Sequence, residues 1–336
     1  MAQGTILLTG ITGFIAKRIA LDLLRAGYTV RGSLRSQKRE SEVRDTLARH
    51  LTDAKALDRL SFVELDLMQD RGWDTAMSGV DAVIHTASPF PLGQPKDESD
   101  IIRPAVDGTL RALKAAQAAG VRRVVLTASM ESVMHGVLSD PITEADFSDP
   151  EADTCSAYTR SKIFAERAAW DFLRAHPDMQ LTVINPGLVC GTPMDSHTGS
   201  SVNVIKRFFN GKDPMVPDMV LPIVDIDDVA LMHVRALSTP ASIGKRYIAC
   251  DSFAPIPTLT RALKAEFPER RIPTRVAPDW MIKLLALIDP QIKLVVKWLG
   301  WTPTLSHAAA TRDLGVTFTP ADTAVLKTAR FLARRP

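Results

Sequence analysis

The sequence predicts an α/β protein built on a doubly wound parallel sheet, with a smaller lobe at its C-terminal end. Two observations support this fold class. Short apolar runs alternate with longer amphipathic segments through the first half of the chain, and a glycine-rich turn follows the first apolar run. Such alternation is typical of parallel strands joined by crossover helices. After residue 187 proline becomes frequent and the alternation ends, which predicts the second lobe.

Composition narrows the class of protein further. The 336 residues are 46% hydrophobic and 24% charged, and 41 basic against 38 acidic residues leave a net charge of +3. So small a net charge argues against nucleic acid or an acidic membrane surface as a partner. A membrane span needs about 20 mostly apolar residues, whereas charges and Pro290 divide the segment 280–301 into two predicted amphipathic helices. We therefore predict no membrane association.

The cysteine and acidic residues do not suggest a metal site. Cys155, Cys190 and Cys250 are far apart and form no CxxC pair or zinc-ligand spacing, so we expect free thiols in a reducing cytoplasm. Three aspartates lie between residues 225 and 228, directly before a predicted helix at 229–237. We interpret them as an N-cap followed by solvated acids.

The predicted elements follow in the order that the fold requires. Strands are expected at 5–9, 29–33, 61–65, 82–86, 121–127 and 181–184, and helices at 14–26, 42–51, 101–119 and 155–175. In the second half, we expect Phe208, Phe209 and the apolar side chains of 280–301 to form the core of the lobe.

The turn after the first strand has the spacing of a dinucleotide-binding turn. Gly10 ends the strand, and Gly13 and Ala16 open the following helix. Glycines at these positions allow a tight turn and a close approach of the backbone to a pyrophosphate, while the helix N-terminus offers N–H groups to the phosphates. We therefore predict a Rossmann-type domain over residues 1–187 that holds a nicotinamide dinucleotide through Gly10, Thr12, Gly13, Phe14 and Ile15. Residues 188–336 would mainly form the substrate lobe, and we allow for a return of the chain to the first domain near residues 222–250.

The end of the second strand predicts which cofactor is preferred. An acid there would bind the ribose 2′-hydroxyl of NAD, but the segment 30–39 is basic and contains none. A guanidinium group suits a 2′-phosphate. We predict a preference for NADP(H), without excluding NAD(H), with Arg35 as the main contact and Ser33 and Lys38 in support. Asp66, after the third strand, fits an adenine contact beside Leu67 and a helix N-cap equally well.

Three further residues form a candidate catalytic group. Tyr158 and Lys162 are four residues apart in a predicted helix and so share one face, and Ser129 follows a buried strand at the edge where parallel sheets bind ligands. A neighbouring ammonium favours the phenolate, so we expect Lys162 to lower the pKa of Tyr158. Tyr158 would then act as the general acid or base for a carbonyl–alcohol pair, and Ser129 would polarise the oxygen.

These motifs resemble those of the extended short-chain dehydrogenase/reductases. Within that superfamily the chain is similar to the group of dihydroflavonol 4-reductases, cinnamoyl-CoA reductases and yeast-type aldehyde/ketone reductases. The resemblance covers about the first 250 residues and rests on the stretches 10–16, 83–89, 126–129, 158–162, 185–189 and 224–230.

The resemblance implies further contacts. Thr86, Ala87 and Ser88 would pass beside the nicotinamide, and the loop containing Pro186, Gly187 and Val189 would contact its carboxamide. Asp107 stands where many relatives have an asparagine that helps to hold a relay water. The substrate candidates in the cleft are Ser88, Phe90, Met130, Val133, Leu188 and Pro222. Their mainly apolar character favours a medium-sized apolar or aromatic substrate, and Met134 argues against a polyhydroxylated flavonoid.

The function that these observations favour is NADPH-dependent reduction of an aldehyde or ketone, reversible as alcohol oxidation. One alternative is a nucleotide-sugar epimerase or dehydratase with tightly bound NAD, which usually carries the missing acid. The other is a non-catalytic NADP(H) sensor, which commonly lacks the tyrosine or lysine. The expected partner is a small carbonyl or alcohol compound, and the sequence allows a monomer or a homodimer.

Overall fold

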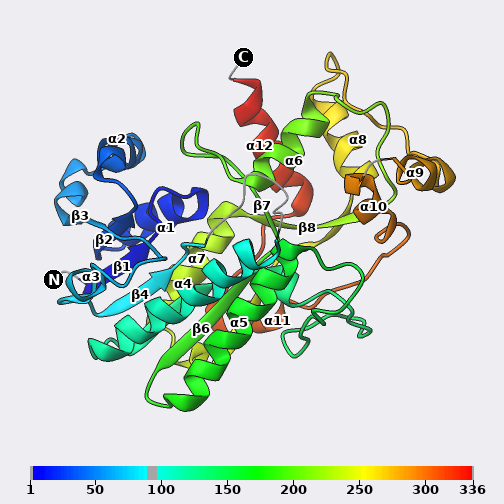
Figure 1. The fold of residues 1–336 in the computed structure, drawn as a ribbon. Helices are drawn as coiled ribbons and strands as arrows, with labels where there is room; N and C mark the ends of the chain where they lie inside the picture. The colour runs from blue at the N-terminus through cyan, green and yellow to red at the C-terminus, as the bar shows by residue number, and fades with distance from the viewer. Residues whose placement is uncertain (1–2, 89–96, 289, 335–336) are drawn as a thin grey trace.

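A computed structural model, which describes residues 3–88, 97–288 and 290–334, confirms the predicted α/β fold class. Its main sheet has seven parallel strands in the order β3-β2-β1-β4-β5-β6-β9 (Figure 1). These strands are β1 (Thr5–Thr9), β2 (Thr29–Leu34), β3 (Leu60–Glu64), β4 (Ala82–His85), β5 (Arg123–Thr127), β6 (Gln180–Pro186) and β9 (Lys245–Ala249). Since all run in one direction, their carboxyl ends meet at one edge of the sheet.

Helices cover both faces of this sheet. One face packs against α1 (Phe14–Arg25), α7 (Ile226–Ser238) and α11 (Ala308–Leu314), and α2 (Glu40–Ala48) lies beside α1. The other face packs against α3 (Trp73–Met77), α4 (Ser99–Ala118) and α5 (Ala157–Ala175), the last two lying side by side in Figure 1. The strands are apolar on both sides because both faces are covered. Short 3₁₀ turns connect elements at η1 (Gln37–Arg39), η2 (Ala54–Arg59), η3 (Met130–Ser132) and η4 (Pro240–Ser242).

The remaining elements form a smaller lobe beside the carboxyl edge. Its three-stranded sheet, in the order β10-β8-β7, consists of β7 (Leu188–Cys190), β8 (Val220–Asp225) and β10 (Ser252–Pro255). Helices α6 (Ser200–Phe209), α8 (Ile256–Glu266) and α12 (Ala321–Ala333) pack around a core that includes Phe208 and Phe209, as expected. Within the described residues, none of the helices has the length and apolar character needed to cross a membrane.

The chain passes between the two bodies more than once. After β8 it returns to the main sheet through α7 and β9, then enters the lobe again at β10. Helix α11 packs against α7 and β9, so a late segment of the chain also belongs to the first body.

The segment 280–301 forms α9 (Asp279–Leu285) and α10 (Pro290–Val296), as predicted, but its burial differs from the prediction. Trp298 and Trp301 do pack against a core cluster. Trp280, however, is 68% exposed, and Leu284, Leu285, Leu287 and Ile288 are exposed as well. The prediction of a buried core is wrong for these five side chains, because amphipathic spacing shows that a helix has an apolar face but not that another element covers it.

Helix starts agree with the capping chemistry of the sequence. Helix α5 begins at Ala157 because the Ser156 side chain accepts a hydrogen bond from Thr159 N. The Asp225 side chain caps α7 in the same way, through Asp227 N, which confirms the predicted N-cap. The expectation of solvated acids is wrong for Asp228, which is buried and accepts a hydrogen bond from Thr319 N. The Ser156 cap fixes where α5 begins and so where Tyr158 and Lys162 stand along it.

Candidate functional site

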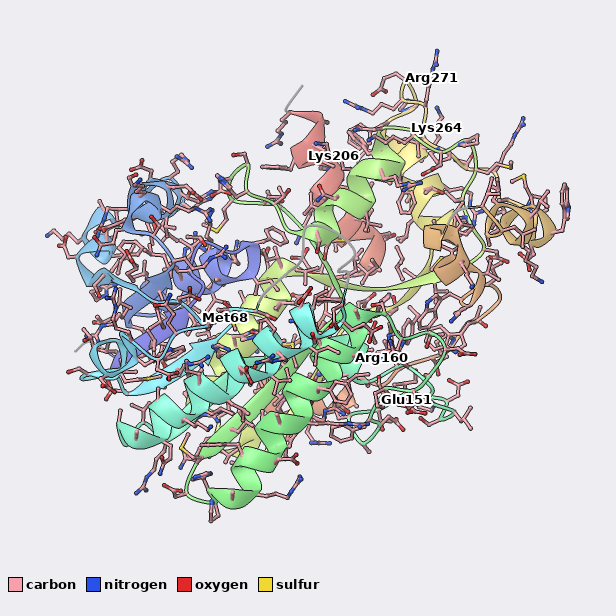
Figure 2. The ribbon with its side chains drawn as sticks, viewed as in Figure 1. Met68, Glu151, Arg160, Lys206, Lys264 and Arg271 are labelled. Carbon is pink, nitrogen blue, oxygen red and sulfur yellow. The ribbon has the colours of Figure 1, made fainter. Side chains whose placement is uncertain are left out.

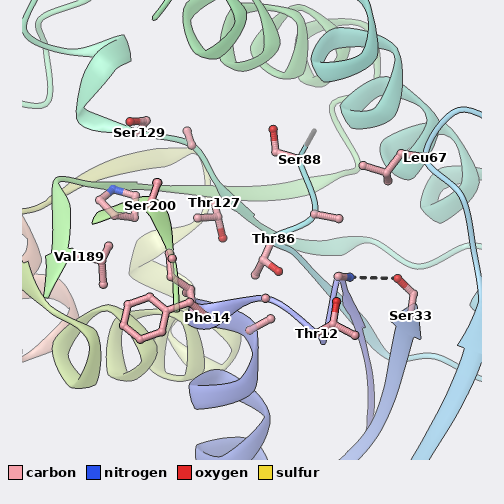
Figure 3. Close-up of a pocket in the computed structure, with 18 of the residues that line it drawn as sticks. Thr12, Phe14, Ser33, Leu67, Thr86, Ser88, Thr127, Ser129, Val189 and Ser200 are labelled. Carbon is pink, nitrogen blue, oxygen red and sulfur yellow. Dashed lines mark hydrogen bonds between the residues drawn. The ribbon is translucent and has the colours of Figure 1, made fainter. Parts of the chain in front are cut away.

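A hollow of about 640 Å³ lies at the carboxyl edge of the main sheet, between its strand ends and the loops that lead into the lobe. Every residue predicted to bind the cofactor lines it except Lys38, and Ser129 lines it too. Figure 3 shows how the turn after β1, the ends of β4 and β5 and the loops after β6 and before α6 surround one space.

The glycine-rich turn forms one wall and has the geometry of an anion cradle. Gly10 has a φ of +67°, and a Cβ atom there would lie 3.0 Å from Ala87 Cα, so a side chain would be strained and crowded. Ser33 holds the turn in place, since its Oγ accepts a hydrogen bond of 3.0 Å from Gly10 N (Figure 3). Helix α1 begins at Phe14 with Gly13 as its N-cap residue, and no side chain of the described residues caps it. Its first N–H groups are therefore left for a ligand such as phosphate.

The basic segment after β2 places one cation at this wall. Arg35 is exposed and lines the hollow, and its guanidinium makes no hydrogen bond or ion pair with the described residues. Lys38 is also exposed but lies on η1 outside the hollow. Arg39 is paired with Glu42 at 2.8 Å. Of these three cations, Arg35 alone is both free and at the cavity wall.

At the far end of the same wall lie Asp66 and Leu67. Both line the hollow, and the Asp66 side chain also accepts a hydrogen bond of 2.9 Å from Met68 N. The structure thus brings this carboxylate to the cavity, but its capping role is in a turn rather than at a helix start. One carboxylate oxygen is occupied by the turn, which fixes the direction of the other.

The loop after β4 is held by hydrogen bonds from the neighbouring strand β1. Thr9 Oγ1 accepts from the backbone N–H groups of Thr86 and Ala87, both at 3.1 Å. Its own proton therefore points to His85 Nδ1, 2.9 Å away, which leaves the neutral His85 ring with its proton on Nε2. Burial lowers the pKa of His85 to about 4, so this ring stays neutral. The next side chain, Ser88, meets α5, because Lys162 Nζ donates to Ser88 Oγ at 2.8 Å.

The candidate catalytic residues converge across α5 and η3. Ser129 caps η3, with its Oγ accepting from Glu131 N at 3.2 Å. The Ser129 hydroxyl also makes a side-chain hydrogen bond with Tyr158. Since Ser129 Oγ already accepts from Glu131, its own proton is available for the Tyr158 oxygen or a substrate oxygen. Lys162 Nζ lies 5.5 Å from the centroid of the Tyr158 ring.

The electrostatics of this group differ from the sequence prediction. Burial raises the pKa of Tyr158 above its usual value, the Glu131 carboxylate raises it further, and the bond from Ser129 opposes them. The expected lowering of the Tyr158 pKa by Lys162 is therefore not seen, and burial of the phenol is the main cause of the rise. Burial also lowers the pKa of Lys162 to about 8, against an opposing effect of Glu131. This environment favours a protonated Tyr158, the form that can donate a proton.

Several predicted residues do not reach the hollow. Met130, Val133 and Met134 are buried in a core cluster with Ile142 and Ile248, because η3 turns this segment towards the protein interior. They are therefore packing residues, and Met134 does not bear on whether a flavonoid fits the hollow.

The other substrate candidates have different positions. Leu188 packs against the core of the lobe, and Pro222 lies behind the hollow, where its carbonyl oxygen would be 2.4 Å from a Cβ atom on Gly187. Ser88 lines the hollow, whereas Phe90 lies outside the described residues. Asp107 lies in a separate surface hollow beside Trp73, so it is not positioned to hold a relay water near Tyr158.

The structure also adds residues that the sequence reasoning missed. Asn185 Nδ2 donates to Ser129 O at 3.1 Å and so fixes the end of β5. Phe14 meets Gly199 at the start of α6, and Gly199, Ser200 and Ser201 close the hollow there. The sequence did single out Asn185, which opens the Asn-Pro-Gly stretch, but no sequence pattern marked residues 199–201 in the irregular half of the chain.

A buried lysine fastens the loop before α6 to the dinucleotide-binding half. Lys17 on α1 is 1% exposed, and its ammonium contacts Asp195 at 2.5 Å and Glu42 at 2.7 Å. His197 lies beside Glu42 at 3.2 Å. The lysine therefore supplies the positive charge within this cluster of potential metal ligands, and it ties the loop before α6 to the wall of the hollow.

Comparison with known proteins places this site in a family context. Residues 6–250 match the model of the NAD dependent epimerase/dehydratase family. The chain is 32% identical over 332 residues to cinnamoyl-CoA reductase 1 of Petunia hybrida, covering 97% of this chain and 91% of that protein. It is 34% identical over 297 residues to a ketoreductase of Aspergillus niger, covering 82% and 86%. Among solved structures, a yeast methylglyoxal/isovaleraldehyde reductase complexed with NADPH superposes with a TM-score of 0.80 at 26% identity, covering 98% of both chains.

Proposed function

Because the chain belongs to the NAD dependent epimerase/dehydratase family, we propose that it is an NADPH-dependent reductase of aldehydes or ketones, able to run in reverse as an alcohol dehydrogenase. The observation that carries this proposal is the convergence of Ser129, Tyr158 and Lys162 on one hollow with the glycine-rich turn. The reductase names of the Petunia, Aspergillus and yeast relatives support it.

The residues of the hollow fit a phosphorylated dinucleotide. The backbone space at Gly10 would be filled by a Cβ atom, and the uncapped start of α1 offers N–H donors for a pyrophosphate. The Arg35 guanidinium, which pairs with no described residue, lies at the same wall and suits a 2′-phosphate. Ser88, Lys162 and the Pro186–Val189 loop would face the nicotinamide end. When bound, the reduced cofactor supplies the hydride.

The chain's own residues would complete the reaction. Ser129 donates a hydrogen bond to the substrate carbonyl oxygen and stabilises the charge that develops there. Tyr158, protonated in its buried setting, transfers its proton to the same oxygen, so that carbonyl, hydride and proton give the alcohol. Lys162, held by Ser88, keeps positive charge beside the phenolate that forms. In the reverse direction Tyr158 accepts the proton of the alcohol.

A carbonyl screen tests the proposal. Wild-type protein and Tyr158→Phe are mixed with NADPH or NADH and a panel of aliphatic and aromatic aldehydes and ketones, and cofactor oxidation is followed by absorbance. We expect oxidation of NADPH with at least one compound and loss of about 10²-fold or more in the variant, with NADPH binding retained. Retained NAD⁺ after purification, with no demand for added cofactor, would instead support an epimerase or dehydratase. Cofactor binding without any turnover would support a sensor.

A further inference from the structure

Behind the catalytic group lies a carboxylate that the proposed reaction does not yet use. Glu131 stands in η3, two residues after Ser129, and its side chain is 26% exposed. One of its oxygens, Oε2, accepts a hydrogen bond of 2.6 Å from Thr159 Oγ1 and another of 3.0 Å from His135 Nε2. Two donors on a single oxygen aim the carboxylate in a fixed direction.

Glu131 is connected to both Ser129 and Tyr158. Its backbone N–H donates to Ser129 Oγ, and the Thr159 that binds its side chain is the neighbour of Tyr158 on α5. His135 is in turn fixed, since it is 2% exposed, its Nδ1 lies 2.9 Å from Thr154 Oγ1, and its ring meets Trp298 at 5.0 Å. Glu131 is therefore braced from η3, from α5 and from the loop that follows η3.

Thr159, which binds the Glu131 carboxylate, lies three residues before Lys162 on α5, so the carboxylate stands beside Lys162. Burial by itself would raise the pKa of Glu131, but the bonds from His135 and Thr159 and the charge of Lys162 lower it overall, so the group is a carboxylate. Burial lowers the pKa of Lys162 to about 8, and Glu131 opposes that fall. The other titratable groups that face Lys162 or Glu131 are Tyr158 on α5, His85 at the end of β4, His135 after η3 and the Cys155 thiol before α5. Glu131 is the anion among them.

We propose that Glu131 is a positioning residue whose carboxylate balances Lys162 and keeps its ammonium protonated across the pH range in which the enzyme works. This inference rests on the proposed function and deepens it. Without the balancing charge, Lys162 would lose its proton at lower pH, and Tyr158 would also ionise at lower pH. Carbonyl reduction needs a protonated Tyr158 beside a charged Lys162, and each of these changes removes one of the two.

The first test is the pH profile of kcat/KM for reduction by wild type and Glu131→Gln, an isosteric change that removes the charge. We expect the alkaline limb to move to lower pH by about one unit, with nearly unchanged NADPH affinity. Thr159→Val keeps the carboxylate but removes one bond that aims it, and should give a smaller shift in the same direction. Glu151→Gln is the matched control because Glu151 is exposed on the loop before α5 (Figure 2); its profile should coincide with wild type.

A second test needs no substrate. The rate of acetylation of Lys162 by acetic anhydride, measured by mass spectrometry across pH, follows the neutral amine. We expect Glu131→Gln to move this titration to lower pH, and Thr159→Val to move it by less. If Glu131→Gln does not fold, Thr159→Val still tests the proposal. Coincident profiles for wild type and both variants would overturn the role of Glu131. A shifted titration in a protein that turns over no carbonyl compound would instead retain the Glu131–Lys162 coupling and overturn the proposed function.

Discussion

Replacing Arg35 by alanine should separate the two nicotinamide cofactors. Arg35 lines the hollow, and its guanidinium has no hydrogen bond or ion pair to the residues that the structure describes, so it is placed to bind a 2′-phosphate. Hydrogen bonds to charged groups contribute about 1.5–3 kcal/mol, and exposure of this side chain places the expected value at the lower end, about 1.5 kcal/mol. That corresponds to a roughly tenfold increase in the Kd of NADPH.

The assay is a fluorescence titration of wild type and Arg35→Ala with NADPH and NADH, at low and at moderate salt. NADH lacks the 2′-phosphate, so its Kd should hardly change. Lys38→Ala is the matched control, since Lys38 has the same charge on the same connection but lies outside the hollow. An equal loss of affinity for both cofactors, or an equal effect of the Lys38 change, would refute the role assigned to Arg35.

Three further variants test the walls of the site. Gly187→Ala would place a Cβ atom 2.4 Å from the carbonyl oxygen of Pro222, so it should lower the free energy of unfolding by about 1–3 kcal/mol and weaken NADPH binding; unchanged melting and binding would show that this close approach is not needed. Lys17→Met would leave Asp195 without its buried cation and should cost about 3–5 kcal/mol in urea unfolding; a stability equal to wild type would contradict the clamp. Burial lowers the pKa of His233 from 6.5 to about 4 in the folded protein. The unfolded state therefore binds one more proton between these pH values, and the free energy of unfolding should fall by up to about 3 kcal/mol as the pH drops from 6.5 to 4. His233→Gln should flatten that slope, and an identical slope in both proteins would argue against this assignment.

Local sequence was sufficient for the parts of the site that lie at strand ends. The turn at Gly10 and the serine at 129 each follow a strand of the parallel sheet, and parallel strands bring such residues to one edge whatever the details of packing. The four-residue spacing of Tyr158 and Lys162 likewise put both on one side of α5. These predictions depended on geometry that a strand or helix imposes by itself.

The predictions that failed depended on contacts distant in sequence. The turn of η3 buries Met130 and Val133 against residues near 142 and 248, so an apolar segment beside the catalytic serine became core rather than a substrate wall. Trp280 shows the reverse case, an apolar residue that no described element covers. The buried ion pair of Lys17 could not be predicted, because its partner Asp195 is far away in the sequence.

In the proposed reaction, hydride passes from NADPH to a carbonyl carbon while Tyr158 protonates the oxygen. The most direct test is to run the reaction with NADPH deuterated at the hydride position, for each face of the nicotinamide, and to measure the label in the alcohol by mass spectrometry. We expect one deuterium on the carbinol carbon from one face only, and a transfer rate lowered by about 10²-fold or more in Tyr158→Phe. Alcohol formed without the label, or undiminished transfer in the variant, would contradict it.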